Sequence, residues 1–583
     1  MLPYVQGTLL PINLQSGIFF GGHTSERSDT RRHSRLAHAC NLDIDQVADR
    51  VRKCSIVCTL GDSWTSPESI QMMKNGGMNI LRLNLSMTPP ETCRRVISCI
   101  RALDELSNFT PCVAVAMDMT APPIRTGIFE GGIDAEVFLK EGDMIDLTMD
   151  KAYLEKSTTK QLFVDTSLFP QMISCVYRGD RIHIGDGLIT LVVQTIGMNY
   201  LTCLIEEGGT VGGYQRVFLP RERQNQLHVK SDYEKDLSFA AECGVDFVFT
   251  SFVTDADMSL ARSILSKQTK LFAKLETRDS IKSLPQLIAT ADGIIISRAD
   301  LGLQYSPEKI FKLQKYVISH CNVAARPVFV IGQLLESMRT KPRPTRAEST
   351  DVANAVLDGA DGIILSVETS RGIFPLETLS TVDRVCREAE RAFCHETYRA
   401  ELKQSRLLRG LDQRDATSVT AISAVEASAS CGATAIFVIT TSGRSAISTA
   451  TAKPSCPIIV ITRDPIVARH CHAYHGLHSY VYTGPQLEDW CEDMDLRINT
   501  AISSAKERRL VSAGDTVVIV IGSLAGEGST NTMQIFHVPD DKATLKVVSS
   551  RNNLVYPEFC SDAVEIPEEK THQRGIDELL LPI

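Results

Sequence analysis

The chain has 583 residues, of which 43% are hydrophobic, so it is long enough to bury the cores of several domains. Its formal net charge of -9 gives no general electrostatic reason to bind nucleic acid or an anionic membrane, and no apolar run approaches the roughly 20 residues of a membrane span. Its 17 cysteines are scattered, without the spacing of a small disulfide framework, which favours a reducing compartment. We therefore expect a cytoplasmic multidomain protein with no nucleic-acid or membrane partner.

The two ends of the chain differ in composition from the rest. Residues 1–45 contain the basic stretch SERSDTRRHSRLAH, which acidic residues interrupt. That pattern is less typical of a mitochondrial presequence than of a disordered or clasping N-terminal arm. Residues 541–583 mix EIPEEK with a short apolar finish and are interpreted as a C-terminal appendage.

Eight short apolar runs follow the arm, and each precedes a helix-like segment. They are CSIVCTL, NILRLNL, CVAVAMD, DFVFTSF, LFAKLET, GIIISRA, PVFVIGQ and GIILSVE. Eight such βα units predict a parallel (β/α)₈ TIM barrel, an α/β fold, here divided between residues 46–121 and 229–400. The intervening residues 122–228 carry Gly-rich turns and alternating strands, which predict an inserted all-β domain.

A separate α/β layer is predicted for residues 401–540, built on AIFVIT, PIIVIT and VVIVIG. The segment TTSGRSA follows the first of these strands and opens a helix, so its backbone N–H groups and hydroxyls can bind a phosphate, with Arg444 nearby. GSLAGEGSTNT supplies a second Gly-rich loop on the same edge. Either loop alone is typical of a turn, but together they indicate an anion site.

Polar side chains end the predicted barrel strands, where the reactive groups of such barrels lie. These residues are Arg82, Asn84, Ser86, Asp118, Ser251, Lys274, Glu276, Asp300, Ser366 and Glu368. Glu276 and Asp300, from adjacent strands, suit a hard divalent cation such as Mg²⁺. Lys274 and Arg82 can hold a phosphoryl group. The alternative is a chain of ion pairs that closes the barrel mouth.

The stretch RHCHAYHGLH, residues 469–478, contains four histidines and a cysteine. No second ligand pair at finger-like spacing accompanies His472 and His475. A helix with solvent-facing histidines is therefore favoured over a zinc site.

Several motifs together resemble the pyruvate kinase family. KPRPTRAESTDVANAVLDGADGIILSVET, residues 341–369, is similar to the family signature, and NILRLNLS, IRTG, FAKLET, SRADLG, LLESM and TSGRSA occur in family order across residues 50–540. The resemblance implies a barrel, a mobile β lid inserted after the third strand and a C-terminal effector domain, usually in a homotetramer. It implies transfer of the phosphoryl group of phosphoenolpyruvate to ADP, with Mg²⁺ and K⁺, in glycolysis.

The resemblance also implies roles for individual positions. Lys274 and Arg82 would hold the transferred phosphoryl group, and Glu276 and Asp300 the Mg²⁺. The implied K⁺ ligands are Asn84, Ser86, Asp118 and the carbonyl of Met119. Further implied residues are catalytic Ser366 and Glu368, substrate-binding Ala299, Asp300 and Gly332, and nucleotide-binding Asn84, Arg125 and Gln215. For a sugar bisphosphate effector they are Thr440, Thr441, Ser442, Gly443, Arg444, Ser445, Trp490 and Arg497.

The chain departs from the family pattern around this site. Gly332 stands where the family has a threonine, and Ala299 where it has a glycine; the other departures are Val367 in SVET, Met87 in NLSM, Pro123 in MTAPPIRTG and Gln215 in place of a lysine. We expect a raised KM for ADP and phosphoenolpyruvate, higher turnover on restoring threonine at position 332, and weak effector binding. Two alternatives remain: a catalytically weakened paralogue that acts as a binding or tetramer-assembly partner, and a different barrel reaction on an enolpyruvate-like substrate.

Overall fold

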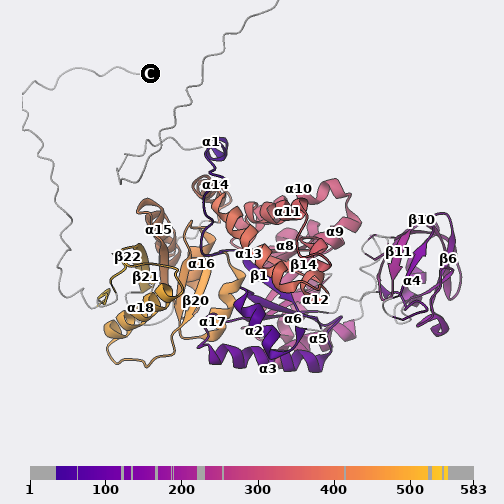
Figure 1. The fold of residues 1–583 in the computed structure, drawn as a ribbon, viewed down its shortest axis with the longest axis horizontal. Helices are drawn as coiled ribbons and strands as arrows, with labels where there is room; N and C mark the ends of the chain where they lie inside the picture. Colours follow the sequence, from indigo (N-terminus) through magenta and orange to yellow (C-terminus); the bar gives the residue numbers. More distant parts are fainter. Residues whose placement is uncertain are drawn as a thin grey trace, which may run out of the picture.

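Three folded bodies lie in a row along the molecule, with the barrel in the middle, the inserted domain on one side and the C-terminal domain on the other (Figure 1). The structure is a computed structural model. It describes residues 34–548 apart from 62–63, 120–123, 133–134, 165–168, 186, 188, 220–229, 252–254, 412–414, 523–527, 529 and 541–543. Residues 1–33 of the predicted arm and 549–583 of the predicted appendage lie outside this description. The domain boundaries given above stay predictions.

Eight parallel strands close into a barrel in the order β1-β17-β16-β15-β14-β13-β3-β2. They are the eight apolar runs that the sequence indicated: β1 Ser55–Thr59, β2 Ile80–Asn84, β3 Ala114–Asp118, β13 Phe247–Thr250, β14 Lys270–Leu275, β15 Gly293–Ser297, β16 Val328–Ile331 and β17 Gly362–Leu365. Nearly every residue of these strands is buried. Strands covered on both faces read as continuous apolar runs, which is why the sequence revealed them.

Aromatic rings fill the inside of the barrel. Phe272 lies with its ring centroid 5.5 Å from that of Phe247 and 5.3 Å from that of Phe329. Gly293 and Gly362 leave room for these rings, because a Cβ at position 293 would lie 2.2 Å from the Phe272 ring and one at 362 would lie 2.7 Å from Phe329. The glycines that begin β15 and β17 are therefore packing requirements of the barrel interior.

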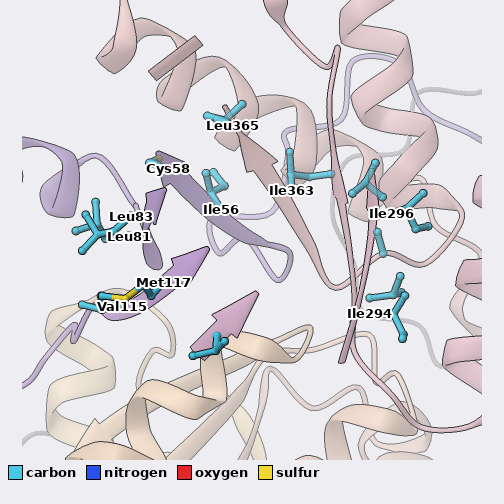
Figure 2. Packing of buried hydrophobic residues seen from close by; sticks show 14 of the residues in the cluster. Ile56, Cys58, Leu81, Leu83, Val115, Met117, Ile294, Ile296, Ile363 and Leu365 are labelled. Carbon is cyan, nitrogen blue, oxygen red and sulfur yellow. The ribbon is translucent and has the colours of Figure 1, made fainter. Parts of the chain in front are cut away.

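The alternate residues of the strands face outward and pack beneath the surrounding helices (Figure 2). Ile294 and Ile296 on β15, and Ile363 and Leu365 on β17, are at most 1% exposed. The barrel helices are α2 Pro67–Asn75, α3 Pro90–Leu106, α5 Lys230–Cys243, α6 Asp255–Ile264, α7 Arg278–Lys282, α8 Leu284–Thr290, α9 Arg298–Gln304, α10 Pro307–Val323, α11 Arg346–Leu357, α12 Val367–Ser370, α13 Pro375–Arg391 and α14 His395–Leu408.

The inserted domain interrupts the barrel between β3 and β13 and consists mainly of strands, as the sequence indicated. Its larger sheet has the order β4-β12-β8-β9-β10-β6-β7, and β11 pairs with β5. The strands are β4 Ile124–Arg125, β5 Glu136–Leu139, β6 Met144–Thr148, β7 Gln161–Phe163, β8 Arg181–Ile184, β9 Ile189–Ile196, β10 Tyr200–Glu207, β11 Gly209–Gly212 and β12 Arg216–Phe218, with one helix, α4 Phe169–Cys175. It has its own apolar core, which includes Phe129 and Leu191.

The C-terminal domain holds a five-stranded sheet in the order β20-β19-β18-β21-β22. Its elements are α15 Ala416–Ser430, β18 Ala435–Ile439, α16 Arg444–Thr451, β19 Ile458–Thr462, α17 Pro465–His470, β20 Leu477–Val481, α18 Trp490–Glu507, β21 Thr516–Gly522 and β22 Thr530–His537. The three predicted strands are β18, β19 and β21. The sequence missed β20 and β22 because both are edge strands with polar residues among the apolar ones.

The histidine-rich segment is not a solvent-facing helix, and that prediction is wrong. Helix α17 ends at His470, and β20, an edge strand of the C-terminal sheet, starts at Leu477; both elements lie on the side of the C-terminal domain next to the barrel (Figure 1). His472 is 5% exposed, and its Nε2 lies 2.9 Å from the carbonyl oxygen of Cys112 in the barrel. The segment therefore forms part of the contact between the two domains.

The described ends of the chain also pack on the folded bodies. Helix α1, Arg35–Cys40, places the Nε2 of His38 3.0 Å from the carbonyl oxygen of Ala392. At the other end, Val547 and Val548 are buried and donate backbone hydrogen bonds of 2.8 and 2.9 Å to Asp495 on α18. Residues 544–548 thus belong to the packed C-terminal domain. Among the described helices, none combines the length and the apolar character needed to cross a bilayer.

Candidate active site

A polar cavity of about 210 Å³ lies at the carboxyl ends of the barrel strands. Its lining includes most of the active-site residues that the sequence singled out: Arg82, Asn84, Ser86, Asp118, Met119, Arg125, Gln215, Ser251, Lys274, Ala299, Asp300, Gly332, Ser366 and Glu368. Glu276 contacts Lys274 but does not itself line the cavity. The strand-end positions that are far apart in the sequence thus meet at one place, as a parallel barrel requires.

Lys274 lies at the centre of the buried charges. Its Nζ atom is 2.9 Å from Oε1 of Glu276 and 3.4 Å from Oδ1 of Asp118, and it donates a 3.1 Å hydrogen bond to Oγ of Ser251. Burial alone would lower the pKa of Lys274, but the carboxylates of Asp118, Glu276 and Asp300 outweigh it and raise that pKa above its ordinary value. Lys274 is therefore a fixed positive charge at neutral pH.

Arg82 and Asp118 form a second buried pair, on neighbouring strands β2 and β3. Arg82 donates from Nε to Oδ2 of Asp118 at 2.7 Å and from Nη1 to the hydroxyl of Thr59 at 2.8 Å. Burial would raise the pKa of Asp118, yet Lys274 and Arg82 together hold it below its usual range. Asp118 stays ionised and fixes the relative position of the two cations.

Two carboxylates from adjacent strands are available for a divalent cation. Glu276 follows β14, and Asp300 lies in the first turn of α9, directly after β15. Glu276 lies 2.9 Å from the Nζ of Lys274, and Asp300 lines the cavity that this lysine also lines. Within the described residues, no group of three or more His, Cys, Asp or Glu side chains is arranged to hold a metal ion. Two hard oxygen ligands nevertheless fit Mg²⁺, which usually takes one or two protein carboxylates and completes its shell with water and substrate phosphate.

The four residues implied for K⁺ gather on one side of the cavity, at the ends of β2 and β3. The backbone N–H of Ser86 donates to Oδ1 of Asn84 at 3.0 Å, and the backbone N–H of Leu85 donates to the carbonyl of Asp118 at 3.1 Å. These hydrogen bonds hold the two strand ends together. These four residues offer only oxygen atoms as metal ligands, which fits a hard monovalent cation such as K⁺.

Ala299 and Gly332 lie against each other at another part of the cavity. Gly332 has a φ of +98°, in the region that favours glycine. Arg298 donates to its carbonyl oxygen from Nε at 3.1 Å and from Nη2 at 2.7 Å, which fixes the loop after β16 against α9. The expectation that threonine at position 332 would raise turnover therefore has to be corrected, since this backbone conformation strains a β-branched residue.

Glu368 and Ser366 shape the rim at the end of β17. The Oε2 atom of Glu368 accepts a 2.8 Å hydrogen bond from the backbone N–H of Ser366, and Oε1 accepts a 3.3 Å hydrogen bond from that of Leu335. Glu368 is 2% exposed. These contacts give it a structural role in joining the loops after β16 and β17, in addition to its place in the cavity wall.

The inserted domain closes one side of the cavity. Arg125 on β4 donates from Nη1 to the carbonyl of Tyr214 at 2.9 Å, and Gln215 donates from Nε2 to the carbonyl of Gly213 at 3.3 Å. Met87, from the barrel, also lines this part of the cavity and is 38% exposed. Among the described residues of this wall, Arg125 brings a positive charge to an anionic ligand, whereas Gln215 and Met87 bring no charge.

A second cavity, of about 430 Å³, lies in the C-terminal domain. Thr440, Thr441, Ser442, Arg444, Ser445, Trp490 and Arg497 line it, and Gly443, at a φ of +83°, forms the turn into α16 with its N–H donating to the hydroxyl of Thr440 at 3.0 Å. Gly528 and Thr530 from the second Gly-rich loop reach the same cavity, while most of that loop, including Glu527, lies outside the described residues. The two loops therefore do converge.

Several lining residues were not found from the sequence. In the cavity at the barrel mouth they are Tyr214, Ser297, Gln333, Glu336 and Arg371, and in the C-terminal cavity they are Thr417, Arg463, Glu488 and Asp493. Arg463 directly follows β19 and Ser297 is the last residue of β15, so the strand-end rule could have found both. Nothing in a pattern of apolar runs distinguishes the others from polar residues without a role in a site.

Together the closed barrel and its buried lysine, arginine and carboxylates define a barrel enzyme suited to phosphoryl chemistry. The family descriptions "Pyruvate kinase, barrel domain" and "Pyruvate kinase, alpha/beta domain" match residues 51–379 and 418–536. The chain belongs to the pyruvate kinase family.

Curated relatives from distant organisms agree with the assignment to this family. The chain is 40% identical to pyruvate kinase PKLR of Homo sapiens over 511 residues, which cover 86% of this chain and 88% of that protein. It is 32% identical to a pyruvate kinase of Schizosaccharomyces pombe and 33% identical to one of Kluyveromyces lactis, with 85% and 87% of this chain covered and 96% and 100% of those proteins. These relatives support phosphotransferase function and do not favour the alternative of a binding or assembly partner.

Proposed function

We propose that this protein is a cytoplasmic pyruvate kinase that transfers the phosphoryl group of phosphoenolpyruvate to ADP, giving pyruvate and ATP. The observation that carries the proposal is the position of Lys274, whose Nζ lies within 3.4 Å of both Glu276 and Asp118 in a cavity that Arg82 also lines. A fixed ammonium and a fixed guanidinium at one point neutralise the charge that moves with a phosphoryl group.

Each group has a distinct task in this mechanism. Lys274 and Arg82 bind the phosphate of phosphoenolpyruvate, and Asp118 keeps both cations in place. Glu276 and Asp300 would hold Mg²⁺, which supplies further charge neutralisation when it is bound. Asn84, Ser86, Asp118 and Met119 would hold K⁺. Arg125 binds the phosphates of ADP from the lid side.

The enolate that phosphoryl transfer leaves behind must gain a proton to become pyruvate. Threonine is absent at position 332, so the proton has to come from water or from another hydroxyl of the cavity, such as that of Ser366. With Gln215 and Met87 beside the nucleotide, we expect the protein to be active with raised KM values for ADP and phosphoenolpyruvate. A charge-assisted hydrogen bond contributes about 1.5 to 3 kcal/mol, or roughly tenfold or more in affinity.

A coupled assay tests the proposal: purified protein is given phosphoenolpyruvate, ADP, Mg²⁺ and K⁺, and pyruvate is measured. Pyruvate formation that stops when ADP is omitted supports it. No turnover at millimolar substrate would refute it and return the chain to the alternative of a binding or assembly partner. Sedimentation of the same preparation tests the homotetramer that we propose for the quaternary state, and calorimetry with fructose 1,6-bisphosphate tests the effector.

A further inference from the structure

Ser297 occupies an unusual position at the junction of β15 and α9. It is the N-cap residue of α9, yet its side chain makes no capping hydrogen bond to the helix backbone. An N-cap serine normally accepts a hydrogen bond from a backbone N–H of the first turn. Here the hydroxyl donates instead to Oδ2 of Asp300, at 2.5 Å. The side chain of Ser297 therefore binds the carboxylate of Asp300 and does not cap the helix backbone.

This contact lies inside the candidate active site. Ser297 is 5% exposed, Asp300 is 6% exposed, and both line the barrel cavity. Lys274 lines the same cavity as Asp300. A short hydrogen bond to an ionised carboxylate is among the stronger ones and restricts rotation of the carboxylate plane.

The backbone around Ser297 is held firmly. Ser297 pairs in register with Ile331 on β16, and the next residue, Arg298, donates to the carbonyl oxygens of Gly332 and Gln333 at 2.7 and 2.9 Å. Arg298 also donates to Oδ1 of Asp351 at 2.7 Å. The hydroxyl of Ser297 is thus presented to Asp300 from a support that is fixed on two sides.

We propose that Ser297 is a positioning residue for the divalent cation: its hydroxyl holds the carboxylate of Asp300 in the orientation in which it receives the metal. The inference rests on the proposed function, in which Asp300 is a Mg²⁺ ligand. Outer groups that orient metal ligands typically contribute 10- to 100-fold in metal affinity. The prediction for Ser297 is specific, because it concerns metal affinity and not the binding of phosphoenolpyruvate or the folding of the barrel.

The chain offers a matched control in Ser306. It is the N-cap residue of α10, also makes no capping hydrogen bond, and donates its hydroxyl to Oε1 of Glu308 at 2.5 Å. The two contacts have the same donor, the same kind of acceptor and the same length. The Ser306 contact is exposed and outside the cavity, so Ser306→Ala removes an equivalent hydrogen bond without touching the metal ligands.

The experiment measures binding of Mn²⁺, a paramagnetic substitute for Mg²⁺, to the full chain by electron paramagnetic resonance without substrates. We expect Ser297→Ala to raise the Mn²⁺ dissociation constant about tenfold. Ser297→Thr, which keeps the hydroxyl, and Ser306→Ala should stay within about twofold of the parent. Asp300→Asn serves as the reference for loss of a ligand and should weaken binding at least as much as Ser297→Ala.

Three results would overturn the inference. Ser297→Ala could bind Mn²⁺ as the parent does while Asp300→Asn does not. Ser297→Thr could be as weak as Ser297→Ala, which would make side-chain size and not the hydroxyl the cause. Asp300→Asn could leave Mn²⁺ binding unchanged, which would remove the metal from this carboxylate altogether. Pyruvate formation by the parent chain is assayed separately, so failure of the proposed function is distinguishable from failure of the role of Ser297.

Discussion

A Cβ atom added to Gly332 would lie 3.3 Å from the Cβ of Ala299 and 3.0 Å from its backbone nitrogen. The family pattern has a threonine at position 332 and a glycine at position 299, so the two departures of this chain are reciprocal. The methyl group of Ala299 occupies space beside a position that has lost its own side chain. Restoring a side chain at position 332 while Ala299 remains therefore creates a close contact, whereas restoring glycine at position 299 alone does not.

The first prediction concerns this pair. Gly332→Thr should lower stability by about 1 to 3 kcal/mol, because the backbone at φ +98° disfavours a β-branched residue and the new Cβ meets Ala299. Turnover with phosphoenolpyruvate should not rise. The double variant Ala299→Gly, Gly332→Thr removes the methyl contact and should recover part of the lost stability. Thermal unfolding and steady-state kinetics of the parent, both single variants and the double variant provide the test; a single Gly332→Thr variant with full stability and faster turnover would contradict it.

The second prediction concerns Lys274. Lys274→Met should lower turnover by about 10²-fold or more, since it removes the charge that stabilises the moving phosphoryl group. It should also destabilise the protein by about 3 to 5 kcal/mol, because Glu276 loses its contact with the buried ammonium and Asp118 loses one of its two buried cations.

Lys282 provides the control for that variant. It pairs with Asp279 at 2.9 Å on the surface of α7, where both side chains are more than half exposed. An exposed pair contributes about 0 to 1 kcal/mol, so Lys282→Met should change neither turnover nor the melting temperature measurably. Equal effects of the two variants on turnover and melting temperature would show that Lys274 has no greater role in catalysis or stability than a surface lysine.

The third prediction concerns the metal carboxylates. Glu276→Gln and Asp300→Asn each remove a hard anionic oxygen, so the Mg²⁺ concentration needed for half-maximal activity should rise about tenfold or more. A Mg²⁺ titration at fixed phosphoenolpyruvate and ADP measures this. Because Glu276 contacts Lys274 at 2.9 Å, Glu276→Gln should in addition lower the pKa of the lysine. Unchanged Mg²⁺ dependence in both variants would place the metal elsewhere.

The fourth prediction concerns the C-terminal cavity. Each of the three described arginines that line it already has a carboxylate partner: Arg463 contacts Asp493 at 3.1 Å, Arg497 pairs with the same aspartate, and Arg444 contacts Asp415 at 3.1 Å. An incoming phosphate must compete with these partners. We therefore expect fructose 1,6-bisphosphate to bind in the micromolar to millimolar range, which calorimetry or the fluorescence of Trp490 can follow. Nanomolar affinity would contradict the weakening, and no binding at millimolar concentration would remove the site.

Asp415→Asn sharpens this test. Asp415 caps α15 by accepting from the N–H of Ser418 at 3.2 Å, and asparagine caps helices about as well as aspartate. The variant removes the charge that competes for Arg444 but keeps the helix. Since the ion pair is exposed, we expect tighter effector binding by about two- to fivefold. Asp150→Asn, at a cap in the inserted domain, should leave the affinity unchanged.

The barrel was predictable because its strands are buried on both faces, so each is a short unbroken apolar run such as GIIIS or VFVI. The same rule failed for β20 and β22. In β20 the residues His478 and Tyr480 alternate with more deeply buried ones, and β22 lies at the sheet edge with alternating exposure, so neither forms an apolar run. The strand-end residues of the candidate site were predictable for a related reason, because the carboxyl ends of the parallel strands of a closed barrel meet at one end of it.

The finer features of the site could not be predicted from the sequence. Whether Ser297 caps α9 or donates to Asp300 depends on a side-chain rotamer, and the contact between Ala299 and Gly332 depends on the φ of a loop residue. Neither is a property of spacing or composition. The burial of the histidine-rich segment depends on the packing of one domain against another, which local periodicity does not contain.

The last prediction concerns how the stability of the protein depends on pH through its buried histidines. Burial lowers the pKa of His472 and His470 to about 4, and that of His478 and His395 to about 3. An unfolded histidine has a pKa near 6.5, so below that pH the unfolded chain binds protons that the folded chain does not. The stability that these histidines contribute is complete above pH 6.5 and is lost as the pH falls toward their folded pKa values.

Glu390 acts in the opposite direction. Burial raises its pKa to about 6, so between its unfolded pKa and pH 6 the folded chain holds the extra proton and Glu390 makes stability rise as the pH falls. Four histidines outweigh it, because each contributes up to about 1.4 kcal/mol per pH unit. The melting temperature should therefore drop clearly between pH 7.5 and 5.5.

His478→Phe isolates one of these contributions. The Nε2 atom of His478 has no hydrogen-bond partner among the described residues, so a ring of similar shape can replace it without orphaning another group. The variant should lose less stability than the parent between pH 7.5 and 5.5, by about 1 kcal/mol. His537→Gln, at an exposed position on β22, should retain the full pH dependence of the parent. A melting temperature of the parent that is flat across this range, or an identical pH slope in His478→Phe, would show that these histidines titrate normally in the folded protein.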